Sequence, residues 1–150
     1  MRNPSIRIRA TQPADSAQIA ELSGQLGYPA SAVAIASRLA RLLAHPDHHC
    51  VFVAVDGEPT LLGWIHAGFS DLLEYDQRGE IFGLVVHESA RGRGVGGALV
   101  AAAEQWVLEH GCAEIGVHSN VVRKESHPFY ERVGYERIKS QHVYRKQIGS

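Results

Sequence analysis

The stretch Arg91-Gly92-Arg93-Gly94-Val95-Gly96-Gly97 decides the fold, because of the segments on either side of it. Before it, residues 80–86 form an almost wholly apolar run, which is typical of a central strand buried on both faces. After it, residues 95–110 have the apolar spacing of a helix that Gly111 ends. A strand at 113–118 completes a β-α-β unit, which is expected to be parallel and right-handed.

The rest of the chain alternates between strand and helix patterns. Alternating or β-branched segments predict strands, and apolar residues at helical spacing predict helices. The order β-α-α-β-β-β-α-β-α-β-β indicates an α/β (α+β) domain, a mixed sheet of about seven strands with four helices. The other predicted strands are 6–9, 50–55, 61–69, 135–138 and 142–146, and the other helices are 13–26, 31–44 and 128–133.

Local signals refine these elements. Thr11 is a possible N-cap ahead of Pro13, and Asp56-Gly57 reads as a hairpin turn. Residues 70–79 read as a polar loop rich in acidic side chains. The helix at 31–44 is expected to bury one apolar face, formed by Val33, Ala36, Leu39, Ala40 and Leu43.

The composition is typical of one globular domain spanning residues 1–150. Fifteen basic and sixteen acidic residues give a formal charge of −1, which argues against a nucleic-acid-binding protein. No run approaches the ~20 apolar residues that span a bilayer. Cys50 and Cys112 form no Cys-x-x-Cys pair, so we expect reduced thiols in a cytoplasmic protein without a metal site.

The glycine-rich turn has the chemistry of an anion site. The first amides of a helix lack internal acceptors and carry partial positive charge, and glycine lets the backbone approach a phosphate closely. Gly92, Gly94 and Gly97 also satisfy the Gly-x-Gly-x-x-Gly pattern of dinucleotide sites, but the next strand ends without the acidic residue that would hold a ribose. A Walker loop would need Gly-Lys-Ser/Thr, which the turn lacks, and a glycine turn without a ligand is the remaining alternative.

Two motifs resemble the GNAT superfamily, the GCN5-related N-acetyltransferases. The family signature Gln/Arg-x-x-Gly-x-Gly/Ala is matched from Arg91 to Gly96. A second motif, Phe-Tyr-Glu-x-x-Gly-Tyr, occupies residues 129–135. The order of the elements also fits, so the resemblance covers nearly the whole chain. Arg123 and Ser126 depart from the residues that many members carry at those positions.

The resemblance implies acetyl-CoA as the cofactor and a GNAT fold. The fourth strand of the family is splayed from the fifth, and its backbone pairs with the pantetheine arm, so the amide of Val86 could polarise the thioester carbonyl. The implied cofactor-binding residues are Leu84, Val85, Val86, Arg91, Gly92, Arg93, Gly94, Val95, Gly96, Gly97, Arg123, Ser126 and Tyr130.

The resemblance also implies direct attack by an amine within a ternary complex. Neutralising a lysine-like amine at pH 7 costs roughly 4–5 kcal/mol, so a base is useful. Glu80 matches a glutamate of related enzymes and is the candidate base, its alternative being a solvated carboxylate at a strand end. Tyr130 matches the tyrosine of the family and is the candidate proton donor to the leaving thiolate, its alternative being a core aromatic.

The acceptor is expected to be a primary amine of a small molecule or peptide. Tyr28, Asp71, Glu74 and Glu80 are the candidate acceptor-binding residues, and acidic side chains there would suit a cationic amine. Relatives are often dimers, so a homodimer is possible. The alternative function is a non-catalytic acetyl-CoA-binding module that acts as a sensor or interaction partner.

Overall fold

The fold is taken from a computed structural model, which describes residues 5–25, 27, 29–57, 59–119 and 126–150. These residues fall into two compact units, Met1–His118 and Ser119–Ser150, and each is described by itself. The first unit contains the sheet, and the second contains one helix. The prediction of a single domain over residues 1–150 stays a prediction.

The first unit is built on a five-stranded sheet in the order β1-β2-β3-β4-β5. The first four strands pair antiparallel, and β5 pairs parallel to β4. Helix α3 connects β4 to β5, which confirms the predicted parallel β-α-β unit. The elements are β1 (Arg7–Ala10), β2 (His49–Val55), β3 (Leu61–Leu72), β4 (Tyr75–Val86), α3 (Val95–Glu109) and β5 (Ile115–Val117).

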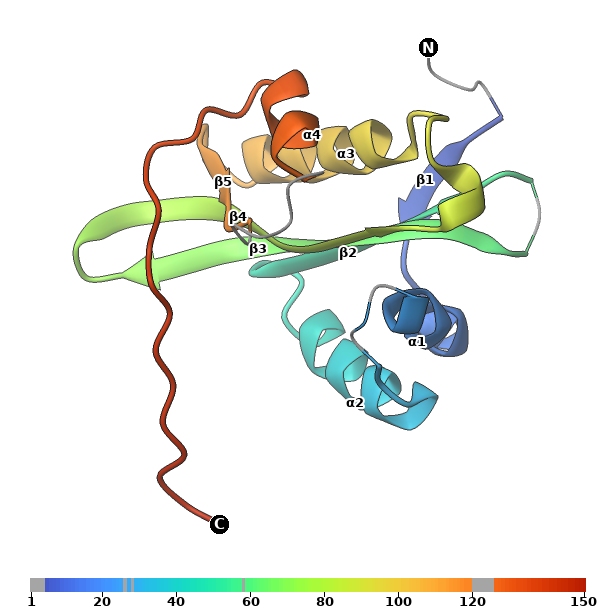
Figure 1. Cartoon of the computed structure of the whole chain (residues 1–150), viewed down its shortest axis with the longest axis horizontal. Coiled ribbons are helices and arrows are strands. Elements are labelled where there is room, and N and C mark those ends of the chain that lie inside the picture. The colour runs from blue at the N-terminus through green and yellow to red at the C-terminus, as the bar shows by residue number, and fades with distance from the viewer. Residues whose placement is uncertain (1–4, 26, 28, 58, 120–125) are drawn as a thin grey trace. The chain divides into compact units, whose positions relative to one another are not determined.

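Helices cover both faces of this sheet. Helix α1 (Ser16–Gln25) and helix α2 (Ala32–Leu43) lie on one face, and α3 lies on the other (Figure 1). On the α1 face, buried Ile19 and Leu22 pack with Val53 and Val85. On the α3 face, an added Cβ at Gly63 would lie 3.2 Å from Leu99. The predicted mixed α/β architecture is therefore confirmed.

The start of α1 differs from the prediction that Thr11 caps it. A short 3-10 helix, Pro13–Asp15, precedes α1, and Gln12 is its N-cap in a capping box with Asp15. The Thr11 amide instead donates to the Val51 carbonyl at 3.0 Å, so Thr11 still belongs to the sheet. Arg9 donates two 2.9 Å hydrogen bonds to the Asp15 carboxylate, and these bonds lower the pKa of Asp15.

The segment predicted as a polar loop, 70–79, is mostly strand. Strands β3 and β4 continue as a long hairpin whose last pair is Leu72 with Tyr75, and the turn falls at Leu73 and Glu74. Side chains 71–77 are exposed, which explains the acidic residues among them, although Leu72, Leu73 and Tyr75 are exposed as well. The acidic residues of this segment therefore reflect a hairpin that is exposed on both faces, and they do not indicate a loop.

The second unit contains helix α4 (Ser126–Arg132), where the sequence predicted a helix at 128–133. The strands predicted at 135–138 and 142–146 are wrong, because the described part of this unit contains no strand and residues 136–150 are exposed. The described residues therefore form five strands and not seven. Alternating residues favour a strand only where another strand pairs with their backbone groups.

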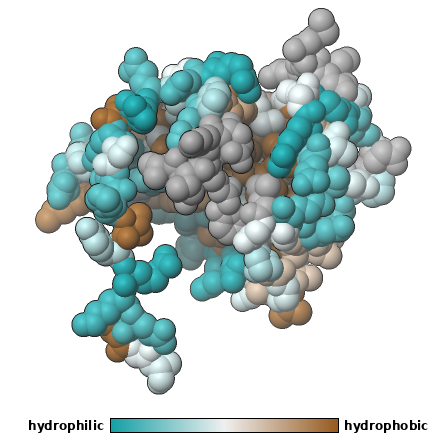
Figure 2. All heavy atoms as spheres, viewed as in Figure 1, coloured by the Kyte–Doolittle hydropathy of each residue, from teal (hydrophilic) through white to brown (hydrophobic). Residues whose placement is uncertain are grey.

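The molecular surface agrees with the ordinary composition. On the face seen in Figure 2, hydrophobic residues occur in separate small groups among hydrophilic ones. Among the described residues, no helix is long and apolar enough to cross a membrane.

Candidate functional site

Strands β4 and β5 separate soon after they begin to pair. Their last pair is Ile81 with Val117, so the β4 residues from Phe82 onward have no β5 partner within the described chain. On the other side of β4, His66 pairs with Gly83 and the next β3 residue pairs with Ile81. Phe82 is therefore the extra residue of a β-bulge, which bends the strand and increases its twist. The bulge accounts for the divergence of the two strands.

The free edge of β4 includes the predicted cofactor residues Leu84, Val85 and Val86. Within the described part of the chain, these residues pair only on the β3 side, with Ile65, Trp64 and Gly63. The prediction that this run is buried on both faces is wrong. Val85 is 6% exposed, but Phe82 is 46% exposed, because the bulge turns its ring out of the core.

The glycine turn leads from this free edge into α3. Gly92 has φ +82° and Gly94 has φ 80°, a left-handed conformation that glycine adopts without strain. The first helical hydrogen bond runs from the Ala98 amide to the Gly94 carbonyl at 3.0 Å. The amides of Val95, Gly96 and Gly97 are thus first-turn donors without a helical acceptor.

The space around the turn is open. A Cβ added at Gly92 or Gly97 would meet no atom within 4 Å among the described residues. Packing within the described residues therefore does not require glycine at position 92 or 97. At position 92 the positive φ favours glycine for a separate reason. An open glycine backbone beside first-turn amides is what an anion site needs.

The two arginines of the turn differ. Arg93 donates to the Asp56 carboxylate at 2.5 Å, which ties the turn to the β2–β3 connection. A hydrogen bond with Ser5 and this bond from Arg93 lower the pKa of Asp56. Arg91 is exposed, and within the described residues no carboxylate pairs with it. Arg91 is thus the more available cation, a difference that the motif alone does not reveal.

Glu80 lies at the point where β4 and β5 begin to diverge. Its Oε2 accepts a 2.6 Å hydrogen bond from the Ser70 hydroxyl of β3, and its Oε1 pairs with His118 Nδ1. The Glu80 side chain is 18% exposed and that of His118 is 76% exposed. The carboxylate is therefore largely covered and bonded by a residue of β3 and by the residue that follows β5.

Comparison with known proteins decides the family. The sequence model of the Acetyltransferase (GNAT) family matches residues 17–135, from α1 to just beyond α4. The chain belongs to the GNAT acetyltransferase family. The resemblance seen in the two motifs is thereby confirmed.

Three similar proteins illustrate the breadth of this GNAT fold. The chain is 31% identical over 117 residues to the aminoglycoside N(6')-acetyltransferase type 1 of Klebsiella aerogenes, covering 76% of each protein. It superposes on AAC(6')-Iy, solved with a CoA bisubstrate analogue, with TM-score 0.82, 23% identity and 95% and 99% of the two chains covered. A transcriptional regulator from Bacillus halodurans C-125 gives TM-score 0.80, 24% identity, and 95% and 98% coverage.

The remaining predicted site residues of this GNAT protein lie in different parts of the chain. Asp71 and Glu74 are exposed on the β3–β4 hairpin, where Gln77 donates to Asp71 at 2.9 Å. Tyr28 and Arg123 lie outside the described residues. Ser126 is the first residue of α4.

Tyr130 lies on α4, within the second unit. Its ring contacts Phe129 and Tyr135 at centroid distances of 5.1 and 5.9 Å. Burial raises the pKa of Tyr130, because desolvation disfavours the phenolate. The phenol is therefore protonated at neutral pH, which a proton donor requires.

Sequence analysis missed a histidine pair on the α1 face of the sheet. His49 Nδ1 and His66 Nε2 are 3.0 Å apart, and the Phe82 ring lies 4.9 Å from that of His66. Burial, with a smaller contribution from His49, lowers the pKa of His66 to about 4. The pair is therefore neutral at pH 7, with one ring donating and the other accepting. Its signal in the sequence is only one histidine on the predicted strand 61–69 and another directly before the predicted strand 50–55.

This pair predicts a loss of stability in mild acid. The unfolded chain binds a proton at His66 below about pH 6.5, whereas the folded chain resists protonation until about pH 4. Stability is therefore complete above the unfolded pKa and falls as the pH drops toward the folded one. We expect the free energy of unfolding to fall by about 1–2 kcal/mol between about pH 7.5 and about pH 5, after discounting for partial exposure.

Denaturant unfolding at both pH values measures this effect. His66→Gln should lose less stability in acid than the wild type, because it removes the group that the unfolded chain protonates. His45→Gln is the matched control, since His45 is an exposed histidine beyond α2. An unchanged pH dependence in His66→Gln would contradict the assignment.

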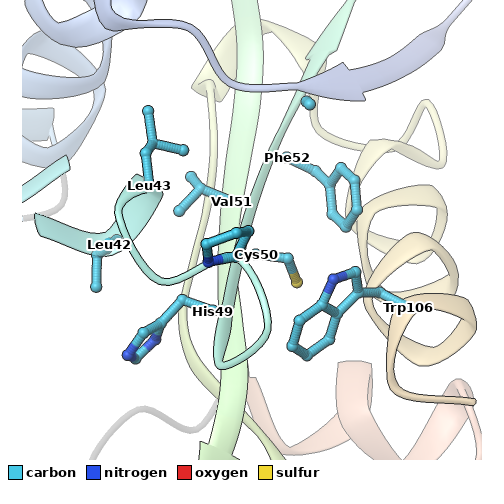
Figure 3. A pocket seen from close by; sticks show the side chains of 9 residues that line it. Leu42, Leu43, His49, Cys50, Val51, Phe52 and Trp106 are labelled. Carbon is cyan, nitrogen blue, oxygen red and sulfur yellow. The ribbon is translucent and has the colours of Figure 1, made fainter. Parts of the chain in front are cut away.

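An apolar pocket of about 210 Å³ lies elsewhere, along β2. Figure 3 shows the Cys50 sulfur and the Trp106 indole on one side of β2, and His49 and Leu42 on the other. Strand β3 separates β2 from β4, so this pocket is distinct from the glycine turn. Burial raises the pKa of the Cys50 thiol to about 12, so it is no nucleophile. The candidate site therefore remains the one formed by β4, β5 and the glycine turn.

Proposed function

We propose that the protein is an N-acetyltransferase that transfers the acetyl group of acetyl-CoA to a primary amine of a small molecule or peptide. The observation that carries the proposal is the free edge of β4, which leads directly into a glycine turn with first-turn amides. This arrangement offers a backbone edge for an extended amide chain and donors for a diphosphate. In coenzyme A the pantetheine arm is joined to the diphosphate, just as the β4 edge is followed by the glycine turn.

Within this proposal, the edge from Leu84 to Val86 binds the pantetheine arm. The amides of Val95, Gly96 and Gly97, with Arg91, bind the diphosphate, and Arg93 holds the turn through Asp56. The amide of Val86 polarises the thioester carbonyl, a contribution that is typically worth ~3 kcal/mol. Arg123 and Ser126 remain proposed cofactor contacts.

The amine approaches from the α1 face, where Glu80 lies. We assign the removal of its proton to Glu80 acting together with its bonded partner His118, and the protonation of the departing sulfur to Tyr130. The amine nitrogen then attacks the thioester carbon directly, and no acyl-enzyme forms. Acidic Asp71 and Glu74, together with Tyr28, favour a cationic acceptor.

Relatives narrow the acceptor classes that are worth testing first. The name of the Klebsiella aerogenes protein specifies the 6'-amino group of aminoglycosides, so aminoglycosides lead the panel. Polyamines, amino acids, peptide N-termini and lysine side chains complete it. Thioester consumption should rise above the hydrolysis background with at least one class.

A non-catalytic acetyl-CoA sensor is the alternative function. It is favoured by the likeness in fold to a protein described as a transcriptional regulator. Both functions predict acetyl-CoA binding, which calorimetry measures, but only the enzyme predicts turnover. Binding with no turnover on any amine would favour the sensor, and no binding would overturn both.

We also propose that the protein is located in the cytoplasm and forms a homodimer. Both cysteines, Cys50 and Cys112, are free thiols, which suits the reducing cytoplasm. A homodimer is proposed from the resemblance, and light scattering in solution tests it.

A further inference from the structure

Side chains from both neighbouring strand segments reach the Glu80 carboxylate. Glu80 pairs with Gly68 on β3 and with Gly116 on β5. Ser70 and His118 each follow one of these glycines by two residues, so their side chains point to the same face as Glu80. Both therefore lie beside the carboxylate, which accepts from the Ser70 hydroxyl and pairs with His118 Nδ1.

This network fixes the tautomer of His118. A carboxylate only accepts hydrogen bonds, so the His118 Nδ1 that faces Glu80 carries the proton. Neutral imidazole then has a free lone pair on Nε2. Glu80 is largely covered, whereas the His118 side chain is 76% exposed, so an incoming group meets the imidazole more readily than the carboxylate.

The position of His118 suits proton transfer at the thioester. It follows Val117, the last β5 residue paired with β4, and so lies where the two strands open. The thioester is expected at this opening if the proposed function holds. An orienting carboxylate behind an imidazole base is also the arrangement that activates bases in other hydrolytic and transfer enzymes.

We propose that His118 Nε2 takes the proton of the acceptor amine, and that Glu80 is a positioning residue that orients the imidazole and stabilises its charged form. This inference rests on the proposed function and names the atom that accepts the proton there. Glu80 acts through His118 and has no direct role in the proton transfer.

The proposed reaction forms one C–N bond, breaks one C–S bond and releases one proton overall. The acceptor ammonium gives one proton to Nε2, and the freed lone pair forms a C–N bond to the thioester carbon. The C–S bond breaks, and its electron pair leaves with sulfur. Sulfur leaves as a thiolate and is protonated by the acid proposed above, which regains its proton from water. The amide nitrogen releases its extra proton to water, and the His118 imidazolium does the same.

Among the described residues, we consider the charged and titratable groups on β2, β3 and β4 that share the face of Glu80 and His118. On β3, Ser70 is neutral, and on β4, Arg78 shares the face of Glu80 with its guanidinium 4.1 Å from the Tyr75 ring centre. Beyond Phe82, burial lowers the pKa of His66 and of His49, so that pair adds no positive charge at neutral pH. Among the described residues of these strands, Glu80 is therefore the carboxylate that pairs with His118.

Substitutions test the assignment with an amine that the panel identifies. We expect His118→Gln to lower kcat about 100-fold, the usual contribution of a general base, and to leave the acetyl-CoA Kd nearly unchanged. The wild-type kcat should rise with pH through one protonation step that His118→Gln abolishes. Added imidazole should partly restore His118→Gly. Because the two groups act as a unit, the double variant with Glu80→Gln should be little slower than His118→Gln alone.

His110→Gln is the matched control. His110 is an exposed histidine that follows α3, and α3 covers the face of the sheet opposite to Glu80. Its kcat and pH profile should equal those of the wild type. If His118→Gln also keeps the wild-type kcat and pH profile, the proposal is overturned, while the acetyltransferase function stands.

A second measurement does not depend on turnover. Nitrogen-15 NMR of the imidazole rings should find His118 protonated on Nδ1 in the wild type, with this preference lost in Glu80→Ala. A His118 ring protonated on Nε2 in the wild type would overturn the proposal even if no amine were acetylated. Absence of turnover with a correct tautomer would instead count against the proposed function.

Discussion

Gly94→Val is expected to raise the acetyl-CoA Kd at least about 100-fold. Gly94 is the N-cap of α3 with φ 80°, where a β-branched residue is strained by about 1–3 kcal/mol. Relief of that strain would move the first-turn amides, and each lost bond to a charged phosphate costs about 1.5–3 kcal/mol. Together these losses correspond to two or more factors of ten in Kd. Calorimetry with acetyl-CoA measures the change.

Gly111→Val controls for the strain itself. Gly111 follows the other end of α3 with φ +87°, and an added Cβ meets no atom within 4 Å among the described residues. Both variants should therefore lose a similar amount of thermal stability. Only Gly94→Val should lose cofactor affinity, and equal affinities in the two variants would contradict the phosphate cradle.

Gly97→Val separates blocked approach from backbone strain. Gly97 lies in the first turn of α3 without a positive φ, and the space beside it is open. A valine there should fold normally yet fill the space that the diphosphate needs. We expect a Kd at least about tenfold higher than that of the wild type, the loss of roughly one phosphate contact. Unchanged affinity would mean that the ligand does not approach this turn.

The central β-α-β unit could be predicted because its signals are local. Residues 80–110 contain an apolar run, then four glycines, then a helical apolar pattern. The residues of each segment predict the local conformation of that segment. The sequence predicts Ser31 as the first residue of a helix, and Ser31 is in fact its N-cap, since its side chain accepts from the Ala34 amide. Such features need no knowledge of the distant chain.

The buried face of α2 could not be predicted, because its apolar residues occupy more than one face. The predicted stripe included Val33 and Leu43, yet Val33 is 80% exposed and Leu43 is 38% exposed. Leu39 is buried, and Ile35 packs against the core. The sheet selects one of two similar stripes, and that choice depends on how the helix is packed.

The bulge at Phe82 and the partners of Glu80 also lay beyond sequence reasoning. One extra residue in β4 leaves the apolar run unchanged in composition, so the sequence does not reveal it. The contact of Glu80 with His118 depends on the register of β4 against β5, which is set after a helix of fifteen residues. Register is fixed by tertiary packing, so residue types alone identified Glu80 but not its partner.

Tyr130→Phe is expected to lower kcat about 100-fold while leaving the acetyl-CoA Kd nearly intact. The substitution removes only the phenolic O–H, which we assign to the departing thiolate. Burial raises the pKa of Tyr130, so the phenol keeps its proton through the neutral range and remains available as an acid. Steady-state kinetics with the best amine of the panel, alongside calorimetry, separates the two effects.

Tyr144→Phe is the matched control, because Tyr144 is an 89% exposed tyrosine in the same unit of the chain. Its kcat should equal that of the wild type. If Tyr130→Phe also retains full turnover, sulfur leaves as a thiolate or takes its proton from water, and Tyr130 is then a packing residue beside Phe129 and Tyr135. A purely structural role would instead lower the melting temperature and kcat together, without an isolated loss of kcat in a fully folded variant.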